Sequence, residues 1–163
     1  MNVFEHAMKM EEDGRSFYLG HAEKTSNPLL KKILLELADD ELKHYNLFKA
    51  MRDHQAAEYK EAEKTTILDT VKNVFETMKA EKQDFTFPDD VRNIWETARE
   101  IERKTEAFYR DQANQLDNDA QKLILTRIAD EEHRHWVTIE NVIQFLDRPK
   151  QWLVDAEWPG LDD

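Results

Sequence analysis

The chain has no cysteine, and its 163 residues include only three glycines and four prolines. Without cysteine, the chain cannot form disulfides, cysteine-ligated zinc sites, iron–sulfur clusters or four-cysteine iron sites of its own. Absent cysteine also fits a reducing compartment, and we expect the protein to be cytoplasmic. The scarcity of turn-forming residues disfavours a turn-rich β fold and favours long helices.

Long apolar runs and excess positive charge are missing as well. No stretch approaches the roughly 18–20 apolar residues of a membrane span. The N-terminal residues 1–6 show no basic region followed by an apolar run, so no signal peptide is expected. The formal net charge is −12, which argues against nucleic acid and anionic membranes as partners, because both require basic patches.

Apolar residues recur at alternating steps of three and four positions, which predicts amphipathic helices. The length suits one domain with a sizeable core. The long helices are expected at about residues 2–24, 29–60, 89–116 and 119–147. Four long helices with short turns inside each pair predict an all-α, ferritin-like four-helix bundle.

We assign the bundle to residues 1–148, with hairpins at about 2–60 and 89–147. The connection at about 61–88 is long enough to cross the bundle, as ferritin-like folds require, and should carry a short crossover helix capped by Thr66. Pro149 should end the last helix, leaving a tail at 149–163. Trp152 and Trp158 in this tail would cover one end of the bundle or form a dimer contact, and we expect a homodimer.

The sequence repeats itself with an offset of 91 residues. Residues 4–48 align with the second half without a gap. The aligned pairs include Glu11 and Glu102, Tyr18 and Tyr109, and Asn27 and Asn118. The two hairpins are therefore expected to be copies of one unit.

The most informative repeated feature is a Glu-x-x-His motif, formed by Glu41 with His44 and by Glu132 with His135. Residues three apart share a helix face, so each Glu and His can reach one point. Carboxylate and imidazole are both metal ligands. All four residues fall on the apolar stripes of their helices, which are core positions.

Two further carboxylates fall on the apolar stripes of the other helices. The turn near Ser26 lies 15 residues from both Glu11 and Glu41. The second hairpin repeats this spacing for Glu102 and Glu132. Antiparallel helices of equal rise bring such positions to one height, so four Glu and two His should converge at mid-bundle.

Such a cluster requires counter-charge. An unpaired buried carboxylate costs several kcal/mol, while a whole domain is stable by only ~5–15 kcal/mol. Lys and Arg are absent from these stripe positions, but two divalent cations would balance four carboxylates beside neutral imidazoles. The alternative is that the carboxylates are exposed or protonated. A Glu on each of two helices and a Glu-x-x-His on the other two is typical of carboxylate-bridged di-iron or di-manganese bundles.

These motifs resemble the rubrerythrin branch of the ferritin-like superfamily over about residues 2–147. The Phe-Tyr pairs that end seven residues after Glu11 and Glu102 belong to the resemblance. It implies a non-haem centre of two Fe ions, with Mn as the alternative, that reacts with peroxide or dioxygen. The metal ligands and catalytic residues that it implies are Glu11, Glu41, His44, Glu102, Glu132 and His135, with Glu41 and Glu132 as bridges. Tyr18 and Tyr109 would donate hydrogen bonds to ligating carboxylates or be ordinary core tyrosines.

Two features differ from the pattern of rubrerythrins. Rubrerythrins carry a rubredoxin domain whose iron is held by four cysteines, so this chain would need an external electron-donor protein. Rubrerythrins also use a further Glu three residues after the third-helix ligand, where this chain has Thr105. Glu106 lies one residue further round the helix.

Two functions of different classes remain open on this sequence. One is an oxidoreductase that reduces hydrogen peroxide or oxidises Fe(II). The other is a non-catalytic protein for iron binding, storage or sensing. The complete set of six ligand candidates favours the enzyme, and the missing rubredoxin domain favours the binding protein.

Overall fold

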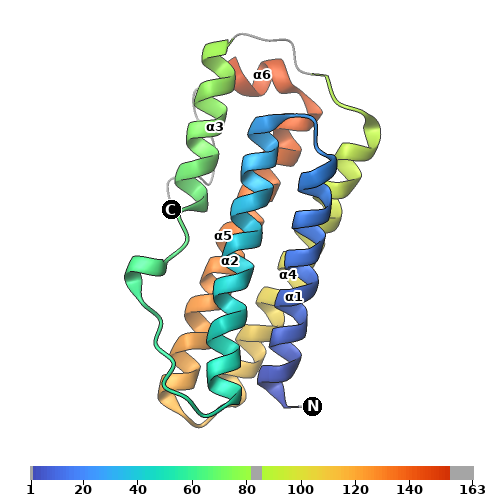
Figure 1. Cartoon of the computed structure of the whole chain (residues 1–163). Helices are drawn as coiled ribbons and strands as arrows, with labels where there is room; N and C mark the ends of the chain where they lie inside the picture. The colour runs from blue at the N-terminus through green and yellow to red at the C-terminus, as the bar shows by residue number, and fades with distance from the viewer. Residues whose placement is uncertain (1, 82–85, 155–163) are drawn as a thin grey trace.

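The computed structural model describes residues 2–81 and 86–154, and within them the fold is all-α and has no strands, as predicted (Figure 1). The helices are α1 (Val3–Lys24), α2 (Pro28–Arg52), α3 (Ile67–Glu81), α4 (Asp89–Gln115), α5 (Asp119–Asp147) and α6 (Pro149–Val154). A single 3-10 turn, η1 (Glu61–Glu63), lies between α2 and α3. No helix in these described stretches is both long and apolar enough to cross a membrane.

The four long helices form two antiparallel hairpins, α1–α2 and α4–α5, that pack against each other. Helices α1 and α5 run in one direction, and α2 and α4 run in the other (Figure 1). After α2 the chain passes along the side of the bundle to α3, and α4 then begins at the end where α1 finishes. This crossing connection gives the ferritin-like order of helices.

Asparagine caps begin three of the long helices. Asn2 accepts a hydrogen bond from the Glu5 backbone N–H at 2.8 Å, and Asn27 accepts two, from Leu29 and Leu30. Asn118, the repeat equivalent of Asn27, caps α5 in the same way. These side chains satisfy N–H groups that have no partner within the helix, so the caps set where each helix starts.

Helix α2 ends at Arg52, about eight residues earlier than the prediction of residue 60. His54 adopts a left-handed backbone conformation with φ of 56°, and the Gln55 N–H donates to the Ala50 carbonyl at 2.9 Å. This left-handed turn closes the helix in the manner usually associated with glycine. The charged residues that follow favour helix by propensity, which is why the sequence suggested a longer one.

Two details of the connection and the tail differ from the prediction. Thr66 stands at the N-cap position of α3, where its carbonyl accepts the Thr70 N–H at 3.1 Å, but its hydroxyl donates to Glu36. The Thr65 hydroxyl oxygen accepts from the Ile67 N–H at 3.1 Å. Pro149 follows the end of α5 but also begins α6, because proline suits a first helical turn. Trp152 of α6 is buried with its ring 5.7 Å from that of Phe75 on α3. Trp158 lies outside the described residues.

The core has two apolar clusters, one toward each end of the bundle. One cluster joins the halves of the long helices nearest the α1–α2 turn, at the top of Figure 1, to α3 and α6. It includes Leu37, Phe75 and Phe145. The other, near the chain N-terminus and the α4–α5 turn, includes Phe48 and Leu125. Between them lies a layer of buried polar side chains, which is the candidate site.

Candidate metal centre

The structure brings the six predicted ligand residues together in this buried layer. The side chains come from all four long helices, and each residue is at most 3% exposed. The six are Glu11 on α1, Glu41 and His44 on α2, Glu102 on α4, and Glu132 and His135 on α5. The alternative that these carboxylates lie on the surface is therefore wrong for this fold.

The six residues form two overlapping groups of four. One group is Glu11, Glu41, His44 and Glu132, and the other is Glu41, Glu102, Glu132 and His135. Within each group, one potential ligand atom from every residue lies within 4.8 Å of the others. Glu41 and Glu132 belong to both groups, which is the arrangement that two carboxylate bridges require.

Both histidines direct the same ring nitrogen at the carboxylates. His44 Nδ1 lies 2.8 Å from Glu132 Oε1 and 3.3 Å from Glu11 Oε1. His135 Nδ1 lies 3.3 Å from both Glu41 Oε1 and Glu102 Oε1. The two rings are roughly parallel, with centroids 6.1 Å apart. Nδ1 is thus the nitrogen that each imidazole presents to the centre of the cluster.

The electrostatics of the metal-free cluster are unfavourable. Burial and the neighbouring Glu132 charge raise the pKa of Glu11 to about 7. Burial and nearby carboxylates also raise the pKa values of Glu41 and Glu102 well above the usual range. Burial alone would lower the pKa of His44, but the facing carboxylates raise it well above normal. Without a metal, the site therefore favours protonated carboxyls and a positively charged imidazole.

The residues present fit a pair of bound cations. One oxygen of each of the four glutamates, in Glu11, Glu41, Glu102 and Glu132, is buried without a hydrogen-bond partner among the described residues. None of the described Lys or Arg side chains is buried. Oxygen and imidazole donors with unused lone pairs, and no basic side chain beside them, match what divalent iron or manganese binds.

Comparison with known families agrees with this geometry. The family model described as Rubrerythrin matches residues 2–143. The chain belongs to the rubrerythrin family. A comparison with curated proteins and a comparison with solved structures each gave no match.

In this rubrerythrin-family chain, each of two repeat-related tyrosines donates a hydrogen bond to a glutamate of the other hairpin. Tyr18 on α1 donates to Glu102 on α4 at 2.5 Å, and Tyr109 on α4 donates to Glu11 on α1 at 2.8 Å. Both rings are fully buried. Burial and the surrounding carboxylates raise both tyrosine pKa values well above normal, so both hydroxyls remain donors.

Sequence reasoning missed an outer pair of buried acids, Asp40 and Glu131. His44 Nε2 lies 2.8 Å from Glu131 Oε1, and His135 Nε2 lies 2.9 Å from Asp40 Oδ2. Each acid thus holds the far nitrogen of the histidine that projects from the opposite hairpin. The offset of 91 aligns Asp40 with Glu131, a signal that was present in the sequence.

Glu131 is held as an anion. Burial raises its pKa, but hydrogen bonds and charge from His44, together with the Tyr59 hydroxyl and the Thr65 N–H, lower it to about 2. A carboxylate hydrogen-bonded to a ligand histidine fixes the ring orientation and makes the other nitrogen a better donor to a metal.

At the position three residues after each first glutamate, the two hairpins carry Gly14 and Thr105. A Cβ on Gly14 would meet Glu41 Oε2 at 3.4 Å, an ordinary contact distance, so the Glu41 carboxylate does not require a glycine here. The Thr105 hydroxyl donates to the Ile101 carbonyl of its own helix at 2.8 Å. Glu106 bonds to Arg110 and lies 3.0 Å from His133, on the outside of the bundle. It does not replace the further family glutamate.

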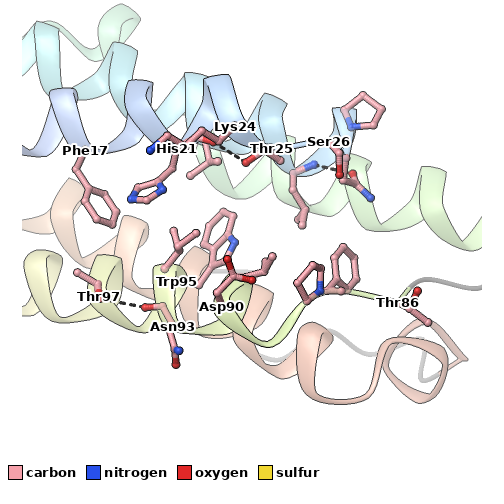
Figure 2. Close-up of a pocket in the computed structure, with 18 residues that line it drawn as sticks. Phe17, His21, Lys24, Thr25, Ser26, Thr86, Asp90, Asn93, Trp95 and Thr97 are labelled. Atoms are coloured by element: carbon pink, nitrogen blue, oxygen red, sulfur yellow. Dashed lines mark hydrogen bonds between the residues drawn. The ribbon is translucent and has the colours of Figure 1, made fainter.

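A separate cavity of about 850 Å³ lies between α1 and α4, near the α1–α2 turn. Figure 2 shows Phe17 and His21 facing Trp95 across it. None of the six ligand candidates lines it. Trp95 precedes Glu102 by seven residues, about two helical turns, so this cavity is distinct from the centre.

Proposed function

We propose that the chain is a non-haem di-iron oxidoreductase that reduces hydrogen peroxide, or oxidises Fe(II) with peroxide or dioxygen. The observation that supports this most strongly is the pair of overlapping four-residue groups that share Glu41 and Glu132. A mononuclear site has no use for two shared carboxylates, whereas a two-metal site needs them. Manganese is the alternative metal, since the same donors suit it.

The roles of the residues follow from their positions. Glu41 and Glu132 would bridge the two ions, Glu11 and His44 would complete one position, and Glu102 and His135 would complete the other. When bound, two irons supply the electrons and the Lewis acidity for reducing the oxidant. The apolar clusters on both sides keep bulk water from the centre, and the tyrosine hydroxyls hold Glu102 and Glu11 in place.

Several partners belong to this proposal. For repeated peroxide reduction we propose an external electron-donor protein, because these 163 residues include no cysteine to hold a second iron centre; in Fe(II) oxidation the Fe(II) itself supplies the electrons. We also propose a cytoplasmic setting and a homodimer.

The alternative is a non-catalytic iron-binding, storage or sensing protein. Thr105 favours it, because the family carboxylate at this position is replaced by a hydroxyl bonded to its own helix. In that case the six ligands would bind iron without repeated turnover.

Stopped-flow absorbance separates the two. Protein loaded anaerobically with Fe(II) is mixed with hydrogen peroxide, and then with an artificial electron donor. If the protein is an enzyme, its bound Fe(II) should be oxidised within seconds, faster than free Fe(II). Turnover should then be slow, at a rate set by the donor. Glu132→Ala protein given the same iron is the control. Oxidation no faster than that of free Fe(II), by a protein that retains its iron, would contradict the oxidoreductase and favour the binding protein.

A further inference from the structure

The segment between α2 and α3 reaches back to the outer pair of acids beside the candidate metal centre. It contributes two side chains, Tyr59 and Thr65, from a region whose sequence suggests only a solvated linker. Thr65 is 8% exposed, whereas Tyr59 is partly exposed. The linker is therefore part of the structure around the site.

Thr65 contacts both outer acids at once. Its backbone N–H donates to Glu131 Oε2 at 3.0 Å, and its hydroxyl donates to Asp40 Oδ2. The hydroxyl oxygen also accepts the Ile67 N–H at the start of α3. With both functions of the hydroxyl engaged, its orientation is fixed.

Through these acids, Thr65 is linked to both candidate histidine ligands. Asp40 Oδ2, which accepts from Thr65, lies 2.9 Å from His135 Nε2. Glu131 lies 2.8 Å from His44 Nε2 through its other oxygen. Each imidazole has Nδ1 directed at the ligand carboxylates and Nε2 directed at an acid that the linker holds.

Tyr59 breaks the symmetry of this arrangement. Its hydroxyl donates to Glu131 Oε2 at 2.5 Å, whereas no tyrosine in the described part of the chain bonds to Asp40. The offset of 91 relates Tyr59 to Lys150 and Thr65 to Ala156, neither of which preserves the side chain. The repeat supplies two equivalent acids, but the linker occurs once and contacts them differently.

We propose that Thr65 and Tyr59 are positioning residues of the metal centre: the Thr65 hydroxyl orients His135 through Asp40, and Tyr59 orients His44 through Glu131. The proposal rests on the proposed function, because it requires that the two histidines bind metal. Loss of a group that orients a ligand histidine typically costs 10- to 100-fold in metal affinity. Since Thr65 and Tyr59 act one bond further out, we expect a loss of about tenfold.

The test uses Co(II) as the probe, because its visible absorption reports the geometry of its ligands. The full chain and its variants Thr65→Val and Tyr59→Phe are titrated with Co(II). The matched controls are Thr66→Val, which removes a neighbouring hydroxyl bonded to Glu36, and Tyr45→Phe, whose hydroxyl bonds none of the described residues. Thr65→Ser keeps the hydroxyl and should bind like the wild type.

Proton NMR of the Co(II)-loaded protein supplies a readout that general destabilisation would not change. The Nε2–H protons of the two histidines should give two strongly shifted, solvent-exchangeable signals. Thr65→Val should shift one signal and speed its exchange with water, and Tyr59→Phe should do this to the other signal.

The outcomes separate the two proposals. If the wild type binds no Co(II), the proposed function fails. If it binds two Co(II) ions and both variants match their controls in affinity and spectrum, the positioning role is wrong while the metal site stands. The role is also wrong if both variants change the same histidine signal. Should Thr65→Val fail to fold by circular dichroism, the partly exposed Tyr59→Phe decides the question.

Discussion

The first hairpin, α1–α2, and the second, α4–α5, carry equivalent ligand candidates but have different surroundings. Both present a Glu on the first helix, a Glu-x-x-His on the second, and a tyrosine that bonds to the opposite hairpin. They differ at Gly14 against Thr105, and in their contact with the linker, where the Tyr59 hydroxyl bonds to Glu131 of the second hairpin. Repetition of a sequence thus produced a symmetric ligand set, while the single linker makes its two halves unequal.

The largest effect is expected when glutamates that belong to both groups of four are compared with glutamates that belong to one. Glu41→Ala or Glu132→Ala should reduce bound iron from two ions per chain to none, because each carboxylate belongs to both groups of four. Glu11→Ala and Glu102→Ala should each leave one ion. Elemental analysis after iron loading measures this. A chain that retains two ions without Glu41 would contradict the assignment of bridges.

A second prediction concerns pH and the protein without metal. The pKa of Glu11 is raised to about 7 in the folded state, above its usual 4.5. The proton on Glu11 therefore stabilises the folded state fully below pH 4.5, and this stabilisation is lost as pH rises through about 7. The free energy of unfolding changes by about 3 kcal/mol, at 1.36 kcal/mol per pKa unit. The raised pKa values of Glu41, Glu102 and the two histidines act in the same direction.

The measurement is urea unfolding of the metal-free protein between pH 5 and pH 8. Stability should fall across this range, and the fall should shrink in Glu11→Gln. Saturating metal should also reduce this fall in stability, because bound cations replace the protons as counter-charge. A metal-free protein equally stable at pH 5 and pH 8 would argue against this account of the buried carboxylates.

The tyrosines test whether the two hairpins are equivalent. Tyr18→Phe and Tyr109→Phe should each destabilise the protein by about 1–3 kcal/mol, because each removes the tyrosine hydrogen bond from a buried carboxylate oxygen. The two losses should agree within about 0.5 kcal/mol if the halves are equivalent here. Chemical denaturation of both variants, with Tyr45→Phe as control, gives the comparison. A large difference would place the asymmetry in the core as well as in the linker.

The smallest effect is expected at Gly14. Gly14→Ala should stabilise the protein by about 0.5–1 kcal/mol, because alanine favours a helix interior and its Cβ would meet Glu41 Oε2 at an ordinary contact distance of 3.4 Å. Thermal unfolding without metal measures this. Destabilisation would mean that the Glu41 carboxylate has no room to adjust.

The sequence alone predicted the helices and the crossing connection. It also predicted that the six ligand candidates are buried and lie at one level along the bundle. These depend on local relations: three- and four-residue spacing sets the buried face, and asparagine sets a helix start. The predicted end of α2 was wrong, because His54 adopts a left-handed conformation that its residue type does not favour. The roles of the six residues as ligands, and the identity of the metal, stay predictions.

Only the tertiary structure decided the contacts between distant segments. Tyr18 bonds to Glu102, 84 residues away, and Thr65 bonds to Glu131, 66 residues away. No periodicity encodes such pairs, because they depend on the path of the chain between the hairpins. The sequence set which faces are buried, whereas the packing of the hairpins and the route of the linker selected which buried groups meet.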